Sequence, residues 1–197
     1  MKPFFIVFVT SLLLFACPGE KEKTAEPVTT EKSEFEQIKE QTIKNPKDAE
    51  AWYHLADLYE RSSMYPEEAD ALKHVIAISP DRGDAHMKLG TAYNRLGDYQ
   101  NAIKHFVIAK QYLPKDAMLY NNLAVAYGKV GKTDDEIANL EKAISIRPHY
   151  ATARYNLGMA FLRKGNRELA LRQYHELTKL DEATAQSLKK EIDAKGK

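Results

Sequence analysis

The sequence contains a single cysteine, Cys17, in 197 residues. One cysteine cannot form a disulfide within the chain, and there is no cysteine cluster of the kind that binds zinc. The histidines form no HExxH motif or similar ligand pair. We therefore predict no metal site and interpret each histidine as a surface or groove residue: His54, His74, His86, His105, His149 and His175.

The sequence also lacks the short motifs of common enzyme classes. No GxxxxGK, GxGxxG or GxSxG occurs, so nucleotide binding and serine hydrolase chemistry have no support. Carboxylates are numerous but are spread as exposed charges along predicted helices. The sequence therefore predicts no catalytic residue and no cofactor. An enzyme or a small-ligand-binding protein is the third of the three hypotheses considered below.

An excess of either charge is missing as well. Lys and Arg number 29 against 28 Asp and Glu, which gives a formal net charge of +1. This balance argues against a strongly basic nucleic-acid-binding protein and against an acidic disordered chain. The hydrophobic fraction of 44% is ordinary for a globular protein, and the length suggests one domain by the rough prior of ~150 residues per domain.

No apolar run is long enough to cross a membrane. The longest begins at Phe4 and ends at Ala16, whereas a spanning helix needs about 20 residues. Lys2 precedes the run and gives it a short basic start. These features fit the hydrophobic region of a secretory signal peptide.

The apolar run ends in Leu-Phe-Ala-Cys at residues 14–17. This order resembles the signal of bacterial lipoproteins, in which an aliphatic and a small residue precede the lipidated cysteine. The resemblance implies a signal peptide at residues 1–16 and lipidation of Cys17, with acyl chains such as palmitate that hold the protein on a membrane. The alternative is an ordinary signal peptide with a coincidental cysteine nearby.

A polar stretch follows the cysteine. Residues 17–32 contain Pro, Thr, Glu and Lys and almost nothing apolar, and this composition predicts a flexible tether with a reach of roughly 20 Å. Ser33 and Glu36 then match a capping box. They predict a helix within residues 33–46, which Pro46 ends.

What the sequence does contain is a period of 34 residues. Similar residues recur at this interval: Leu55, Leu89, Leu123 and Leu157; Pro80, Pro114 and Pro148; Gly97, Gly131 and Gly165. Apolar residues at three- and four-residue spacing predict two amphipathic helices in residues 83–116. Gly97, which tolerates positive φ, ends the first helix, and Asp98 caps the second. Gly90 and Ala102 are small enough for the two helices to approach closely.

The period and the residues Trp52, Leu55, Ala56, Tyr59 and Pro80 of its first copy resemble the tetratricopeptide repeat. The resemblance covers most of the chain and implies an all-α, right-handed superhelical solenoid with a helix at each end. The repeats occupy residues 49–82, 83–116, 117–150 and 151–182. Residues 33–46 resemble the second helix of a partial repeat, and residues 183–197 a capping helix and tail.

Two repeats depart from the family pattern at a core position that is normally small. Glu68 and Glu136 stand where the other repeats have Ala102 and Ala170. In the third repeat, Thr133 and Glu136 match a capping box, and in the first repeat Pro66 suits the first helical position. We therefore predict that these two second helices begin slightly later than the others and pack with local adjustment.

In this family the first helices line a concave face, and the register predicts which residues are exposed on it. The predicted partner-binding residues are Tyr53, Asp57, Met87, Lys88, Thr91, Asn121, Asn122, Val125, Tyr155, Asn156 and Met159, and Glu60, Asn94 and Leu162 adjoin them. The groove is predicted to be acidic at its N-terminal end and to carry amides and apolar groups further along. Amides pair with peptide backbone, whereas Tyr and Met offer apolar contact. The alternative is that these are ordinary solvated residues.

The resemblance implies a non-catalytic adaptor that binds a protein or peptide in this groove. With the lipid anchor, it implies an envelope protein, on the outer membrane facing the periplasm and engaged in envelope complex assembly. The second hypothesis is a self-associating scaffold. One known ligand is not predicted: family members that bind chaperone tails use a clamp of Lys, Asn, Asn, Lys and Arg, and only Asn122 falls on a matching position.

Overall fold

The computed structural model describes residues 33–195, and these residues contain ten α-helices and no strand. The all-α prediction is therefore confirmed for this part of the chain. The predicted signal peptide at residues 1–16, Cys17 and the tether at 17–32 lie outside the described residues. The helices are α1 (Glu34–Lys44), α2 (Ala49–Arg61), α3 (Tyr65–Ile78), α4 (Gly83–Leu96), α5 (Tyr99–Tyr112), α6 (Ala117–Lys129), α7 (Thr133–Ile146), α8 (Ala151–Arg163), α9 (Arg167–Leu177) and α10 (Glu182–Ala194). None of them is long and apolar enough to span a membrane.

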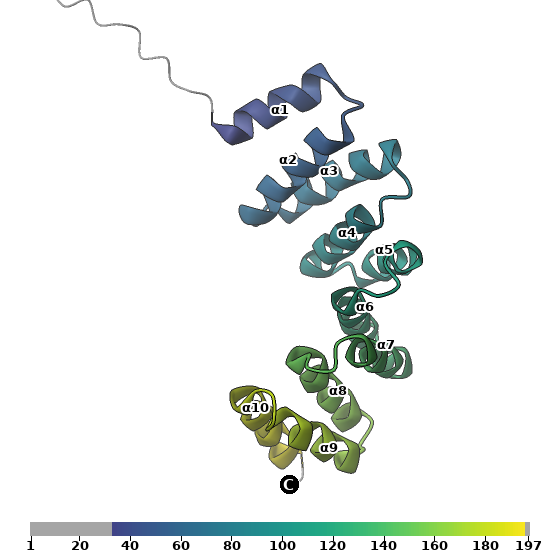
Figure 1. Ribbon diagram of the computed structural model, residues 1–197, viewed down its shortest axis with the longest axis vertical. Coiled ribbons are helices and arrows are strands. Elements are labelled where there is room, and N and C mark those ends of the chain that lie inside the picture. The colour runs from purple at the N-terminus through teal and green to yellow at the C-terminus, as the bar shows by residue number, and fades with distance from the viewer. Residues whose placement is uncertain (1–32, 196–197) are drawn as a thin grey trace, which may run out of the picture. The chain divides into compact units, whose positions relative to one another are not determined.

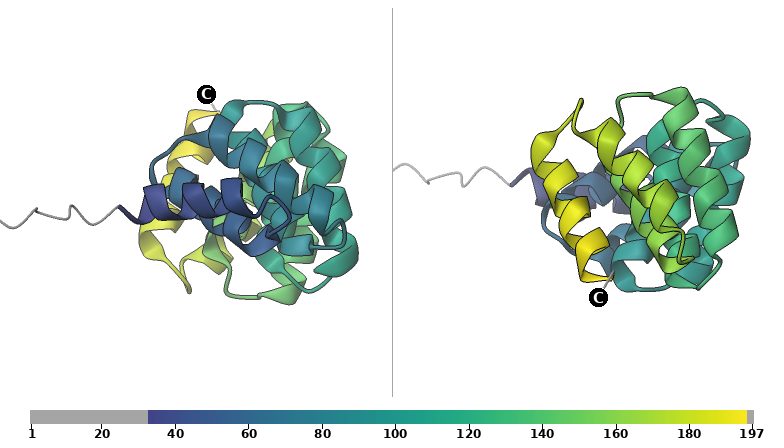
Figure 2. Two further views of the ribbon diagram at one scale, coloured as in Figure 1. Left: turned by 90° about the horizontal axis from the view of Figure 1, so that it is seen from above. Right: turned by 90° about the horizontal axis from the view of Figure 1, so that it is seen from below.

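Eight of the helices form four antiparallel pairs that stack in chain order (Figure 1). The pairs are α2–α3, α4–α5, α6–α7 and α8–α9, with α1 and α10 at the two ends of the series. Seen along the stack, successive pairs are rotated relative to one another (Figure 2). The predicted solenoid of four helix pairs with flanking helices is confirmed.

The turn inside each pair is built from residues that recur with the repeat. Gly97, Gly131 and Gly165 have φ of 79°, 77° and 75°, a backbone region that glycine enters without steric cost. Ser63, at the equivalent position of the first repeat, is the one described non-glycine residue with positive φ, at 57°. Asp98 accepts a hydrogen bond from the backbone N–H of Asn101, so the predicted turn and cap are confirmed.

The helices of one pair approach closely where the sequence has a small residue. A Cβ atom on Gly90 would lie 2.7 Å from the ring of Phe106, which is fully buried. The equivalent residues in the next repeat are Ala124 and Leu140, which are also fully buried. A smaller residue on the first helix thus accompanies a larger one on the second, so that the space between them stays filled.

The prediction that α3 and α7 begin late is wrong. They begin at Tyr65 and Thr133, in the same 34-residue register as the second helices α5 and α9. Thr133 is not an N-cap, because Lys132 holds that position without a side-chain cap bond. Pro66 is the second helical residue rather than the first. In the third repeat the Glu136 side chain packs over Gly128 of α6 instead of returning to the helix start, so the local capping pattern is not used.

The two acidic residues at the small core position are buried rather than displaced. Glu68 is 1% exposed and Glu136 is 4% exposed. The Glu136 carboxyl group lies over Gly128, where a Cβ atom would meet its Cδ at 2.7 Å. Glycine on the first helix therefore makes the space that the longer side chain needs.

Each end of the stack is covered by its flanking helix. At the first end, Ser33 and Glu36 form the predicted capping box at the start of α1, and Phe35 meets the Tyr59 ring edge-on at 5.2 Å between centroids. At the other end, Leu188 and Ile192 of α10 are fully buried. These contacts keep the terminal apolar faces away from water.

Candidate functional site

The first helix of each pair faces the inner side of the stack. Contacts link α4 directly to α6 and α6 directly to α8, as expected for the helices on the inside of a curved array. Side chains tie these helices together. The Lys88 ammonium lies 2.9 Å from Asp57 and 2.6 Å from Glu60, and the Asn94 amide donates to the Asn122 backbone carbonyl at 3.3 Å.

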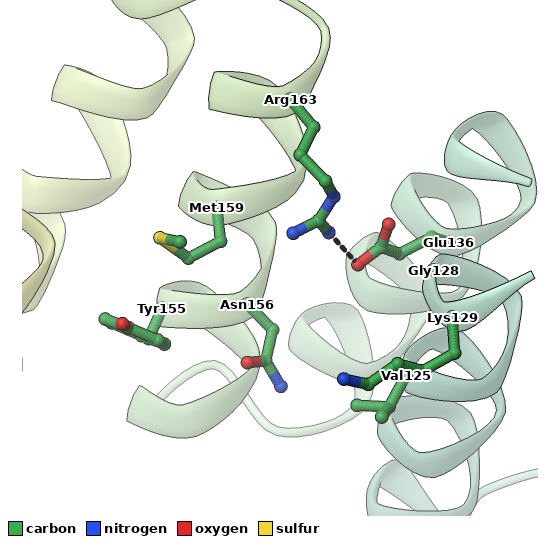
Figure 3. Close-up of a pocket in the computed structure, with 8 residues that line it drawn as sticks. All are labelled: Val125, Gly128, Lys129, Glu136, Tyr155, Asn156, Met159 and Arg163. Atoms are coloured by element: carbon green, nitrogen blue, oxygen red, sulfur yellow. Dashed lines mark hydrogen bonds and ion pairs between the residues drawn. The ribbon is translucent and has the colours of Figure 1, made fainter. Parts of the chain in front are cut away.

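A pocket of about 390 Å³ lies between α6 and α8. Figure 3 shows its lining, which comes from these two helices and from the start of α7. The lining residues are Val125, Gly128, Lys129, Glu136, Tyr155, Asn156, Met159 and Arg163. The volume is in the range of typical ligand pockets, about 300–1,000 Å³.

The charged groups of this pocket are partly paired. The Arg163 guanidinium donates a hydrogen bond to Glu136 Oε1, as Figure 3 shows. Glu136 Oε2 is buried and receives no hydrogen bond in the part of the chain that the structure describes. Lys129 is exposed, and no ion pair or hydrogen bond of its ammonium group occurs within residues 33–195. The lining therefore holds two cations and one anion.

The structure brings four of the predicted groove residues together in this pocket: Val125, Tyr155, Asn156 and Met159. The other half-buried groove residues, on α2, α4 and α6, lie outside its lining: Tyr53, Asp57, Met87, Lys88, Thr91 and Asn122. The Arg82 guanidinium covers the Tyr53 ring at 4.1 Å, and burial with nearby Asp84 raises the pKa of Tyr53 to about 12.

Two residues predicted to be exposed on the groove are buried. Asn121 is 5% exposed, and its Oδ1 accepts a hydrogen bond from the Asn156 amide at 2.9 Å. Asn121 is therefore a link between α6 and α8 instead of a surface for a partner. Leu162, which is 7% exposed, belongs to the hydrophobic core around α8 and α9.

The N-terminal end of the groove is not simply acidic, because its carboxylates have cationic partners. Hydrogen bonds from Lys88 and Arg95 lower the pKa of Glu60. Glu68 lies behind them, with Arg95 3.9 Å away, and neither of its carboxyl oxygens receives a hydrogen bond within the described residues. Burial, with the nearby charge of Glu60, raises the pKa of Glu68 to about 7.

One histidine interpreted above as a surface or groove residue is buried. His86 is 4% exposed, and its Nδ1 lies 3.0 Å from Nδ1 of His105. His86 Nε2 lies 3.1 Å from the Pro80 carbonyl oxygen, so this nitrogen carries the hydrogen that is donated. Burial lowers the pKa of His105 to about 4. The His105 ring is therefore neutral near pH 7, and the two rings contact each other in the packing of α4 on α5.

Sequence reasoning missed the charged half of the pocket. The predicted groove residues do not include Lys129 or Arg163, and the sequence pattern assigns Glu136 to a capping box. The periodicity carries a usable signal, since a basic residue recurs every 34 residues at or next to the end of each first helix: Arg61, Arg95, Lys129 and Arg163. Across residues 33–195, no group of three or more His, Cys, Asp or Glu side chains is arranged to hold a metal ion.

Models of the tetratricopeptide repeat match residues 37–83, 69–117, 118–150 and 151–184. The chain belongs to the tetratricopeptide repeat family. Among solved structures, "Crystal structure of MamA" superposes with a TM-score of 0.73 at 24% identity and covers 77% of this chain and 89% of that one. "YrrB: a TPR protein with an unusual peptide-binding site" gives 0.73 at 22% identity, with 79% and 81% covered. At these identities the likeness shows the fold alone.

Curated tetratricopeptide repeat proteins match parts of the chain. The small glutamine-rich tetratricopeptide repeat-containing protein 2 of Saccharomyces cerevisiae is 31% identical over 137 residues, which are 65% of this chain and 40% of the relative. The Hsp70-Hsp90 organizing protein of Triticum aestivum is 30% identical over 97 residues, 49% of this chain and 16% of the relative. The chain thus spans less than half the length of these curated relatives.

Proposed function

We propose that this tetratricopeptide repeat protein is a non-catalytic adaptor that binds a protein partner along its first helices. The observation that carries the proposal is the pocket between α6 and α8. It combines exposed charge with the apolar surface of Val125, Tyr155 and Met159, and such a mixture suits a peptide better than a small apolar ligand. Similar proteins support it, since one solved neighbour is described as having an unusual peptide-binding site and one relative is named as an organizing protein of Hsp70 and Hsp90.

The test is position-specific photo-crosslinking in intact cells. A photoreactive phenylalanine analogue replaces Tyr155 in the pocket or Tyr112, whose side chain is 46% exposed on the second helix α5. We expect a defined adduct from position 155 that saturates with expression level, and none from position 112. Tyr155→Ala, combined with a crosslinker elsewhere in the groove at Met87, is expected to reduce the adduct at least about tenfold, as for a binding hot spot. Equal labelling from positions 155 and 112 would reject the groove as the binding surface.

We further propose that Cys17 is lipidated and tethers the adaptor to an envelope membrane, on the outer membrane facing the periplasm. The support is the sequence alone: the apolar run before residue 17 and the Leu-Phe-Ala-Cys ending. A tethered adaptor would keep its groove near the membrane and so raise the local concentration of an envelope partner. Assembly of an envelope complex is the process that we propose for it.

Cys17→Ser tests the tether directly. We expect wild-type protein to sediment with membranes and to incorporate labelled palmitate, and Cys17→Ser to lose the label and leave the membrane fraction, because the acyl chains provide the attachment. The groove variant Tyr155→Ala is the control and should stay on the membrane. Unchanged fractionation and labelling of Cys17→Ser would reject the lipid tether while leaving the adaptor proposal intact.

A further inference from the structure

Two cations from neighbouring first helices line the pocket between α6 and α8. Lys129 is the last residue of α6 and Arg163 the last residue of α8, so they hold the same position in consecutive repeats. Figure 3 shows both side chains directed into the space between the helices. The ammonium group of Lys129 has no ion pair or hydrogen bond among residues 33–195, and it is available to an anion.

Glu136 neutralises only part of this charge. Its carboxylate takes one hydrogen bond from Arg163, whereas a guanidinium has five N–H donors. Glu136 is 4% exposed and lies over Gly128, and among residues 33–195 its ion pair is with Arg163 and not with Lys129. The pocket therefore keeps a net positive charge, with donors on Lys129 and Arg163 that remain unused within the described part of the chain.

Apolar side chains lie beside these cations. Val125 stands one turn before Lys129 on α6, and Met159 stands one turn before Arg163 on α8, with Tyr155 one further turn away. A ligand that fits must carry an anionic group next to an apolar one. The lining comes from α6, α7 and α8 alone, so neither α4 nor α10 closes the ends of the pocket. A polypeptide can therefore continue past the site in both directions.

We propose that the pocket between α6 and α8 binds an Asp or Glu side chain of an extended partner segment, with a large apolar side chain next to it. Lys129 and Arg163 hold the carboxylate, and Val125, Tyr155 and Met159 contact the apolar group. The site differs from the chaperone-tail clamp, of whose positions only Asn122 is matched here, and Asn122 lies outside the pocket lining. The proposal rests on the proposed groove function and adds the chemistry of the partner.

Short synthetic peptides test this on the purified full chain. The first probe has acetylated and amidated ends and an Asp between two Leu residues, the second has Asn in place of Asp, and the third keeps Asn but has a free C-terminal carboxylate. Binding is followed by ¹H–¹⁵N NMR. We expect the first probe to shift the signals of Lys129, Val125 and Met159. The affinity of the second probe should be at least about fivefold lower, the equivalent of about 1 kcal/mol.

Lys129→Met removes the free cation and keeps the apolar stem, and Lys142→Met is the matched control. Lys142 is an exposed lysine of α7 that lies outside the pocket lining and has no ion pair among the described residues. We expect Lys129→Met to weaken the Asp probe about fivefold and to abolish its preference over the Asn probe. Lys142→Met should change neither, and raising salt should weaken only the Asp probe.

Four results would overturn the proposal. The first two are equal affinity for the Asp and Asn probes and equal losses of affinity in Lys129→Met and Lys142→Met. The third is binding of the third probe alone, which would assign the site to a terminal carboxylate, and the fourth is absence of binding by every probe. The photo-crosslinking experiment distinguishes failure of this proposal from failure of the adaptor proposal. If position 155 gives an adduct but the Asp and Asn probes bind alike, only the proposed recognition of an acidic side chain is rejected.

Discussion

At the scale of single residues, the buried glutamates of the first and third repeats differ in their cationic partners. Glu136 has Arg163 as a hydrogen-bonded partner, whereas the nearest cation to Glu68 is Arg95 at 3.9 Å and Glu60 adds like charge. The residue that faces each acid on the first helix also differs. Gly128 leaves space for Glu136 in the third repeat, whereas Glu60 stands at the equivalent position of the first repeat. The same substitution is therefore tolerated in two ways.

Glu68 should make the protein less stable as pH rises. Its pKa is about 7 when folded and near 4.5 when unfolded, so between these values the folded state keeps a proton that the unfolded state has released. The free energy of unfolding should therefore fall from pH 5 to pH 7.5, by on the order of 2 kcal/mol. Urea denaturation at the two pH values measures this, and Glu68→Gln should remove that part of the slope.

The neighbouring substitution Glu67→Gln is the control for this pH dependence. Glu67 is exposed, and its replacement should leave the slope as in wild type. Identical slopes for wild type and Glu68→Gln would show that the buried carboxyl group does not favour its protonated form in the folded state.

At the scale of helices, each pair is fitted by matching a small residue to a large one. Gly90 faces Phe106, and the equivalent residues of the third repeat are Ala124 and Leu140. An added methyl group on Gly90 has nowhere to go while the phenylalanine ring is present. The effects on stability of changing these two residues should therefore be coupled. The Ala–Leu pair of the third repeat should be compatible with the second repeat if both residues are changed together.

Gly90→Ala is expected to destabilise the protein by about 1–3 kcal/mol through overpacking. Combined with Phe106→Leu it should cost less than the sum of the two single changes, with a coupling of about 1 kcal/mol or more. Denaturation of the four proteins in the double-mutant cycle measures this. Gly128→Ala, which meets Glu136 instead, should not couple to Phe106→Leu, and additivity in the first cycle would contradict the packing account.

At the scale of the whole stack, stability should be local, because the helices contact mainly their neighbours in the series. Leu188 of α10 is fully buried and fills the space over Gly158 of α8. Leu188→Ala should lower the local opening free energy of α8 and α9 by about 2–5 kcal/mol, the usual cost of such a cavity. Protection of α2 to α5 should be unchanged.

Hydrogen exchange by mass spectrometry measures this helix by helix. Ile43→Ala at the opposite end is the control, since Ile43 is 71% exposed and its loss should change stability by less than about 0.5 kcal/mol. A uniform rise in exchange across all helices after Leu188→Ala would mean that the stack unfolds as one cooperative unit.

Much of this architecture could be predicted from the sequence. The 34-residue period gave the helix pairs and their turns, because each repeat carries its own apolar stripes, turn glycine and stop signals. It also selected Val125, Tyr155, Asn156 and Met159, which the structure brings into one pocket. The local capping pattern at Thr133 misled, because Glu136 turns into the interface with α6 instead of back to the helix start.

The 34-residue pattern therefore specifies the fold, because periodic side chains define the helix faces without reference to distant residues. Which polar side chains bind one another, and which remain available, depends on how the helices pack. Asn121 and Asn122 are adjacent in sequence, yet the first is buried against α8 and the second is only half-buried. Successive residues of an α-helix point about 100° apart, so Asn121 reaches Asn156 of α8 while Asn122 does not. The contacts between repeats likewise pair Arg163 with Glu136 and leave Lys129 unpaired within residues 33–195.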